Sequence, residues 1–196
     1  MTVAMEPDPN AAKWVIPLML SVLDRAILVS PTGKLNDNLI HGALRLIMNQ
    51  YPSVLCQSPM RQKLKGRGYE CYLDKGDKIN RFVQIIHDKQ RDHWFCAYLK
   101  GSKVMVVDSI RTTHLSDTSS LFLQQLARMD KSMLNQNIVF QRCQQQTDVY
   151  SCGLYAIAYA FAAARSDDIP QMRFTQSQMR RHLKGCLENL KLAPFL

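Results

Sequence analysis

The chain has 196 residues, of which 46% are hydrophobic, and it carries a formal net charge of +9 at pH 7. This size and composition fit one globular domain over 1–196 and argue against a disordered chain or a small disulfide-stapled scaffold. The apolar stretch 14–23 has ten residues and contains Pro17, so it predicts neither a membrane span nor a signal peptide.

The six cysteines are scattered and include no C-x-x-C pair. They predict reduced thiols in an intracellular protein of the cytoplasm or nucleus, and no metal site. Basic residues cluster at 61–68 and at Arg180, Arg181 and Lys184. These clusters indicate either a solvated face or an acidic protein partner rather than nucleic acid, because no aromatic residues alternate with the charges. We expect residues 1–13 to form a loose N-terminal arm.

The first half of the chain predicts one helix and then strands. Helical periodicity covers 36–52, where Asn36 or Asp37 can cap the N-terminus and Pro52 ends the helix. Three short runs rich in β-branched and aromatic residues predict strands: 81–87, 93–99 and 104–108. The segment 100–103 predicts a turn between the last two strands.

The second half predicts three helices and one more strand. The predicted helices cover 119–129, 152–164 and 175–191, and the strand covers 137–143. The run 152–164 is apolar or small on every face, which is typical of a helix packed inside a domain. Thr175 and Gln178 have capping-box spacing, and the apolar stripe of that last helix comprises Met179, Leu183, Cys186, Leu187 and Leu190. The order of elements predicts an α+β fold with a mostly antiparallel sheet flanked by helices.

The turn within 100–103 decides which side chains of the hairpin meet. Side chains alternate between the two faces of a strand, so a two-residue turn at 100–101 or at 101–102 puts His93 and Asp108 on the same face. They would lie directly opposite or one diagonal step apart, within reach of each other. A three-residue turn would separate them. A carboxylate beside an imidazole fixes the tautomer of the ring and stabilises its protonated form.

A thiol stands where the buried helix begins. Cys152 directly precedes the apolar run, and a helix N-terminus beside an imidazolium favours the thiolate. Gly153 would let a substrate backbone pass close to the sulfur. The backbone N–H of Cys152 and the side-chain amide of Gln146 are candidate donors to an oxyanion. Each of these residues also has an ordinary structural role, so their order along the chain carries the interpretation.

That order is His-Trp, then Asp-Ser after a hairpin, then Gln, five residues and Cys-Gly. It resembles the ubiquitin-like-protein proteases, which are SUMO-deconjugating cysteine peptidases related to the adenovirus endopeptidase. The matching segments are "DHWFCAYL", "VMVVDSI" and "QQTDVYSCGLYAIAYA", with "GKLNDNLIHGAL" similar to an early Leu-Asn-Asp box of that family. The resemblance covers roughly residues 20–190 and implies a papain-like fold.

The resemblance also implies roles for individual residues. It implies Cys152 as nucleophile, His93 as general base and later acid, Asp108 as the orienting acid and Gln146 in the oxyanion hole. Another group would bind substrate around a narrow channel for a C-terminal Gly-Gly: Trp94, Gly153, Lys34, Asn36 and Asp37. The implied reaction is hydrolysis of a peptide or isopeptide bond after the C-terminal glycine of a ubiquitin-like modifier of the SUMO or NEDD8 type, with no cofactor.

Two positions depart from the family pattern. Lys34 stands where the family commonly has Trp as one wall of the channel, and Ser151 stands where it commonly has Asp before the nucleophile. The first departure bears on diglycine recognition, because an ammonium cannot stack as an indole does. Alternatives left open are a polyprotein-processing endopeptidase of viral or transposon type, a mobile-element-associated member of the family, an acetyltransferase using the same residues, and a catalytically silent module that binds ubiquitin-like proteins.

Overall fold

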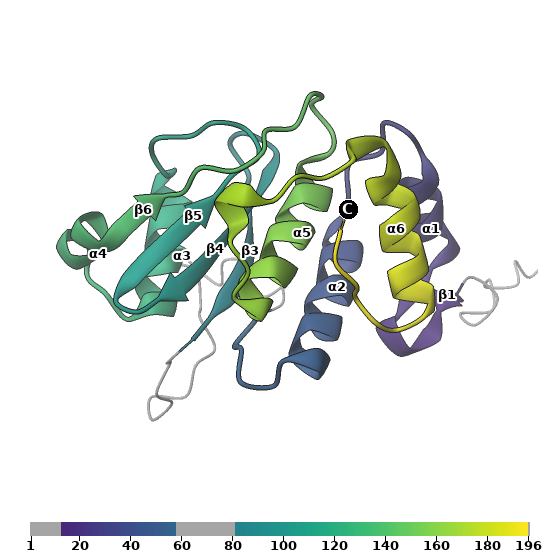
Figure 1. The fold of residues 1–196 in the computed structure, drawn as a ribbon, viewed down its shortest axis with the longest axis horizontal. Coiled ribbons are helices and arrows are strands. Elements are labelled where there is room, and N and C mark those ends of the chain that lie inside the picture. The colour runs from purple at the N-terminus through teal and green to yellow at the C-terminus, as the bar shows by residue number, and fades with distance from the viewer. Residues whose placement is uncertain (1–12, 58–80, 196) are drawn as a thin grey trace, which may run out of the picture.

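A four-stranded sheet forms the centre of one half of the molecule. The computed structural model describes residues 13–57 and 81–195 (Figure 1). The strands are β3 (Val83–Asp88), β4 (His93–Lys100), β5 (Lys103–Val107) and β6 (Ile138–Phe140), in the order β3-β4-β5-β6. The first three strands are antiparallel and β6 is parallel to β5. The prediction of a mostly antiparallel sheet is confirmed, and the parallel pair follows from the long helical connection between β5 and β6.

Helices cover both faces of this sheet. On one face lies α5 (Cys152–Arg165), and all its residues from Cys152 to Ala164 are buried, as the apolar run predicted. On the other face, α3 (Asp117–Ala127) and α4 (Lys131–Asn137) enclose a second apolar cluster with Phe95 and Val106. Side chains of β4 and β5 therefore alternate between two cores, which fixes the register of both strands.

The rest of the chain packs beyond α5 (Figure 1). It contains α1 (Val22–Val29), α2 (Asp37–Gln50) and α6 (Gln176–Glu188), with a short 3-10 turn at Ile16–Leu18 (η1). A second 3-10 turn, Ile169–Gln171 (η3), follows α5 and lies near the ends of β5 and β6. A small hairpin of β1 (Lys13–Val15) and β2 (Leu20–Ser21) closes this half. No helix in the described ranges is both long and apolar enough to cross a bilayer.

Several element predictions need correction. Of the predicted strand 137–143 only Ile138–Phe140 forms β6, and Asn137 is the last residue of helix α4, whose N-terminus Asp130 caps. Helix α4, helix α1 and the β1–β2 hairpin were not predicted. Thr175 precedes α6 but makes no side-chain cap bond, and Leu190 is 43% exposed beyond the end of that helix rather than part of its apolar stripe.

The predicted N-terminal arm and one basic cluster fall mostly outside the described ranges. Residues 1–12 of the arm and the cluster 61–68 are not among the residues that the structure describes. Lys13, counted with the arm, belongs to β1. In the second basic cluster, Arg180 donates hydrogen bonds to the carbonyls of Leu28 (3.3 Å) and Gly33 (2.7 Å), so it ties α6 to α1 rather than standing free for a partner.

Candidate active site

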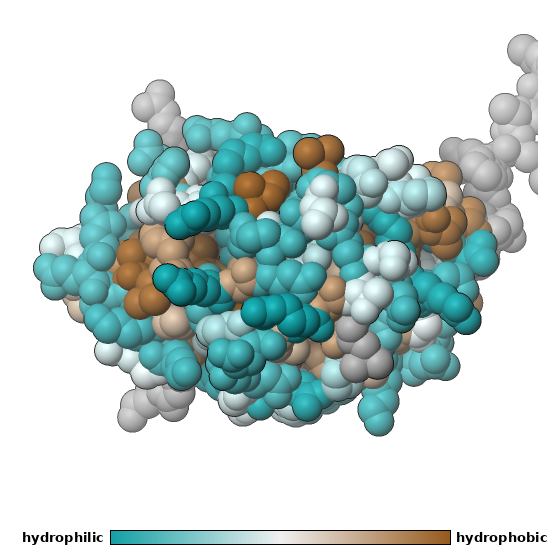
Figure 2. All heavy atoms as spheres, turned by 45° about the horizontal axis from the view of Figure 1, so that its top comes forward, coloured by the Kyte–Doolittle hydropathy of each residue, from teal (hydrophilic) through white to brown (hydrophobic). Residues whose placement is uncertain are grey.

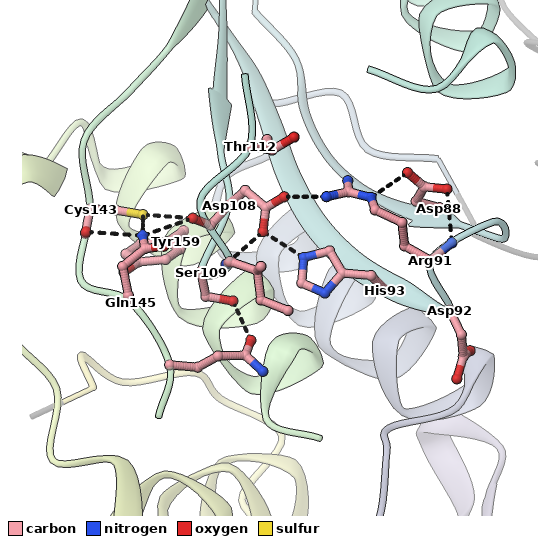
Figure 3. Close-up of polar contacts among 12 residues, drawn as sticks. Asp88, Arg91, Asp92, His93, Asp108, Ser109, Thr112, Cys143, Gln145 and Tyr159 are labelled. Atoms are coloured by element: carbon pink, nitrogen blue, oxygen red, sulfur yellow. Dashed lines mark hydrogen bonds and ion pairs between the residues drawn. The ribbon is translucent and has the colours of Figure 1, made fainter. Parts of the chain in front are cut away.

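The turn of the β4–β5 hairpin brings His93 and Asp108 together. The turn consists of Gly101 and Ser102, because Lys100 pairs with Lys103, and Gly101 has the positive φ of 59° that glycine tolerates best. In this register His93 lies one diagonal step from Asp108. The imidazole Nε2 is 2.5 Å from Asp108 Oδ1, and both residues are buried (Figure 3).

The remaining oxygen of Asp108 faces an arginine. Arg91 Nη1 lies 3.4 Å from Asp108 Oδ2, and Arg91 Nε lies 2.8 Å from Asp88 Oδ2 (Figure 3). The guanidinium thus bridges two buried carboxylates, and the backbone N–H of Ile110 donates to Asp108 Oδ1 at 2.9 Å. Both oxygens of the candidate acid are held in place, and a charged donor occupies Oδ2.

The other side of the His93 ring faces Cys152. Cys152 is the first residue of α5 and its side chain is buried, so the thiol lies at the positive end of the helix dipole. Burial by itself lowers the pKa of His93, but hydrogen bonds with Asp108 and Cys152 and the charges of both outweigh it and raise the pKa to about 9. Because Nε2 contacts Asp108, Nδ1 is the nitrogen left to exchange a proton with the sulfur.

Gln146 is held by Ser109, the residue that follows Asp108 in the chain. The backbone N–H of Gln146 donates to the Ser109 carbonyl at 2.9 Å, and the Ser109 hydroxyl donates to Gln146 Oε1 at 2.6 Å. Gln146 Nε2 donates to the backbone carbonyl of Asp148 at 2.7 Å. An amide nitrogen carries two hydrogens, so one N–H remains that can donate to a substrate oxygen.

Asp148 shapes the loop that delivers the thiol. Its carboxylate accepts bonds from the backbone N–H groups of Tyr150 (3.0 Å) and Ser151 (2.8 Å), from the Ser151 hydroxyl (2.7 Å) and from the Gln176 amide (2.7 Å). A carboxylate is therefore present beside the start of α5 although residue 151 is serine. The sequence contained this signal, since an Asp whose side chain bonds the backbone two or three residues on is a common turn former.

A hollow of about 450 Å³ is lined by Asp92 and Trp94, the two residues that flank His93 in the chain, and by Leu35, which packs against Gly153. Trp94 forms part of its wall: the indole Nε1 donates to the Leu35 carbonyl at 3.0 Å, and the His87 ring packs on the indole with centroids 4.4 Å apart. Lys34 Nζ closes the rim through an ion pair with Asp92 Oδ2 at 2.6 Å. Sequence reasoning assigned no role to His87, and its position here depends on strand pairing with Trp94 across β3 and β4.

Four of the five residues predicted to bind substrate line this hollow, and Gly153 is not among its lining residues. Lys34, Asn36, Asp37 and Trp94 all line it. However, Asn36 is occupied locally, because its Oδ1 caps the backbone N–H of Leu39 and its Nδ2 donates to Asp24 at 2.7 Å. It therefore fixes the start of α2 and the shape of the wall.

Gly153 has a different reason to lack a side chain from the predicted one. A Cβ at this position would lie 2.9 Å from the Leu35 Cβ, so Leu35 and not a substrate backbone occupies the space. We expect Gly153→Ala to lower the free energy of unfolding by about 1–3 kcal/mol through overpacking. Gly185→Ala on α6 is the matched control, since nothing lies within 4 Å of that position, and it should raise stability slightly. Thermal unfolding of both variants measures the difference, and equal melting temperatures would contradict the packing argument.

Comparisons with known proteins concern the fold. No protein-family model and no curated protein matches the sequence. Among solved structures, the SUMO protease Ulp1 with its catalytic cysteine oxidized to a sulfinic acid superposes with a TM-score of 0.66 at 18% identity, covering 89% of this chain and 87% of that chain. The C-terminal Ulp1 protease domain in complex with Smt3, the yeast orthologue of SUMO, gives 0.65 at 20% identity, with 88% and 85% coverage.

A third structure agrees with these two. The Ulp1-like SUMO protease catalytic domain of Chaetomium thermophilum gives a TM-score of 0.57 at 22% identity over 82% of this chain and 74% of that chain. The chain has the α+β fold of the Ulp1-like SUMO proteases, the papain-like architecture that its sequence motifs predicted.

Proposed function

We propose that the chain is a thiol protease that hydrolyses a peptide or isopeptide bond after the C-terminal glycine of a ubiquitin-like modifier. The observation that carries the proposal is the position of His93, which contacts Asp108 through one ring nitrogen and Cys152 through the opposite edge. Such an arrangement converts a weak nucleophile into a thiolate beside an imidazolium.

The first half of the reaction forms an acyl-enzyme. The Cys152 thiol gives its proton to His93 Nδ1, and the sulfur attacks the carbonyl carbon of the substrate glycine. The carbonyl oxygen becomes an oxyanion, which accepts hydrogen bonds from the free N–H of Gln146 and the backbone N–H of Cys152. When the C–N bond breaks, His93 donates its proton to the leaving amine and a thioester remains on Cys152.

The second half hydrolyses the thioester. Neutral His93 takes a proton from water, the resulting hydroxide attacks the thioester carbon, and the same two donors stabilise the second oxyanion. The C–S bond then breaks, the sulfur leaves as thiolate beside the imidazolium, and the acid with a free C-terminal carboxylate departs. The Asp108 carboxylate stabilises the imidazolium at both stages.

The hollow beside Trp94 supports a modifier tail as the substrate. It lies between α2 and the start of β4, and its wall is formed by an indole, a histidine ring and a backbone carbonyl already bonded to the indole. One of the structures that share this fold was solved in complex with Smt3, which makes SUMO-type modifiers the first substrates to test.

A panel of ubiquitin-like modifiers with C-terminal electrophiles tests the proposal directly. We expect the wild-type protein to form a covalent adduct with one modifier or a small subset, detected as a mass shift, and Cys152→Ala to form none. Rapid labelling of Cys152 by a small thiol reagent together with no modifier adduct would overturn the modifier proposal. Slow labelling across pH 5–8 would contradict the thiolate itself and favour a silent binding module.

A processing endopeptidase remains a second candidate because of one contact. The Lys34–Asp92 ion pair stands at the rim of the hollow, where the family pattern has an aromatic wall. An exposed ion pair contributes little binding energy and can open for a bulkier peptide. A protein of this second kind would cleave a short internal motif and would not react with folded modifiers.

Lys34→Trp tests whether an aromatic side chain at the rim of the hollow improves binding of a diglycine substrate. An indole at this position would restore an aromatic contact worth about 0.5–1.5 kcal/mol, so we expect KM for a diglycine substrate to fall by roughly 2- to 10-fold with kcat nearly unchanged. Lys34→Ala is the control, because it removes the ion pair without adding a ring. An equal fall in KM in both variants would show that loss of the ion pair, not stacking, is responsible.

A further inference from the structure

A second groove lies on the other side of Asp108 from His93. In Figure 3, Cys143 and Gln145 stand on that side and His93 on the opposite side. The groove has a volume of about 820 Å³ and runs between the ends of β5 and β6, the segment 141–145 that follows β6, and η3. The mechanism above assigns it no part in the reaction.

Three arginines border this groove: Arg111, Arg142 and Arg173. All three are exposed, and neither Arg111 nor Arg142 forms an ion pair within the ranges that the structure describes. Arg173 Nη1 donates to the carbonyls of Pro170 and Met172, which holds its side chain at the rim. We call this site, defined by the three arginines, the arginine groove.

The lining of the arginine groove offers no competing negative charge. Its one acid is Asp108, which is 5% exposed and whose carboxylate is engaged by His93 and Arg91. The rest of the lining consists of glutamine amides, threonine hydroxyls and a few apolar side chains. Figure 2 shows this face, where dark teal side chains gather around a small brown area over the β5–β6 end of the sheet. Guanidinium groups favour carboxylates because they offer two parallel N–H donors.

The groove is physically linked to the catalytic acid. The Cys143 thiol and the Gln145 amide each donate to the backbone carbonyl of Asp108 at 3.1 Å. A polypeptide bound between the arginines would therefore lie beside the strand end that carries Asp108, close to the cleft but outside it. The arginines of the groove come from three separate segments, which suits an extended chain with several carboxylates better than a single small anion.

We propose that the arginine groove is an exosite that binds an extended acidic segment of the polypeptide substrate. This inference rests on the proposed protease function for the identity of the substrate. It requires only that carboxylates of that substrate reach Arg111 and Arg142 while the scissile bond lies at Cys152. The exosite contributes to substrate affinity and takes no part in bond cleavage.

Direct binding tests the exosite separately from catalysis. The probe is a short fluorescein-labelled peptide of alternating Glu and Gly, with a Gln-Gly counterpart, measured by anisotropy on Cys152→Ala protein at physiological ionic strength. We expect Arg111→Gln/Arg142→Gln to weaken binding of the acidic peptide by about 10-fold. Lys100→Gln/Lys103→Gln, which removes the same charge from the β4–β5 turn, should change it by less than about 2-fold.

Three results would overturn the exosite. They are equal weakening in both double variants, equal binding of the Gln-Gly peptide, and tighter Arg111- and Arg142-dependent binding of a single-stranded oligonucleotide. The last would assign the groove to nucleic acid. Loss of modifier reactivity would count against the protease proposal and not against the exosite, because the binding assay uses a protein that cannot cleave.

Discussion

Replacing Asp108 by asparagine is expected to lower kcat by about 10⁴-fold while the fold is kept. The reason is that the Asp108 carboxylate bonds both His93 and Arg91. Arg91 donates to Oδ2 and the Ile110 N–H donates to Oδ1, so an amide at this position leaves one of these donors facing its NH₂. Arg91 carries a charge, so we expect the asparagine oxygen to face the guanidinium and the NH₂ to face His93. His93 Nε2 would then have to accept, its proton would move to Nδ1, and Nδ1 could no longer take the proton of Cys152.

A double variant makes this tautomer argument falsifiable. With Arg91→Met added to Asp108→Asn, the amide is free to turn its oxygen to His93, and we expect kcat to recover by about 10-fold, the factor of one hydrogen bond to a charged group. Arg91→Met alone is the control and should reduce kcat only modestly. If the second change brings no recovery or a further loss, the arginine does not dictate the orientation of the amide.

The pH profile of kcat/KM provides an independent readout of the same contact. Since the pKa of His93 is raised to about 9, the imidazolium persists through neutral pH and activity should fall on an alkaline limb near that value. Without the Asp108 charge, burial still lowers the pKa, so the limb of Asp108→Asn must move to lower pH. An unchanged limb would show that Asp108 does not set the protonation of His93.

The second large effect is expected at Gln146. Gln146→Leu removes the side-chain donor to the oxyanion and should lower kcat by about 10²–10³-fold, or roughly 2.7–4 kcal/mol, with little change in KM. Gln145→Leu is the neighbouring control, because the Gln145 amide is exposed and bonds backbone and Cys143 rather than the cleft. We expect a loss of less than about 3-fold there.

Ser109→Ala tests whether the donor needs to be held. The Ser109 hydroxyl bonds Gln146 Oε1, so its removal should leave the donor present but less well oriented and cost about 10-fold in kcat. Steady-state kinetics should therefore give the lowest kcat for Gln146→Leu, a higher kcat for Ser109→Ala and the highest of the three for Gln145→Leu. A Ser109→Ala variant as impaired as Gln146→Leu would indicate that Ser109 has a role beyond orienting the amide.

Local patterns in the sequence specified the central strands, the longer helices and the order of the candidate triad, but not helix α1 or the β1–β2 hairpin. The all-apolar run after Cys152 specified a buried helix, and strand alternation placed His93 and Asp108 on one face once the turn was Gly101–Ser102. These features depend on residues close together in the chain, so periodicity and turn chemistry determine them. The short helix α4 was not predicted, because seven residues are too few to show a clear helical periodicity.

The tertiary structure alone decided which distant groups surround those residues. Arg91 meets Asp108, Ser109 meets Gln146, and Leu35 fills the space at Gly153 only because the sheet, the loop before α5 and the start of α2 converge. The arginine groove likewise assembles side chains from three separate segments. The spacing of residues in the sequence determines which side chains lie on one face of a strand or helix. The packing of elements far apart in the chain determines which groups each side chain contacts, and this packing depends on the whole core.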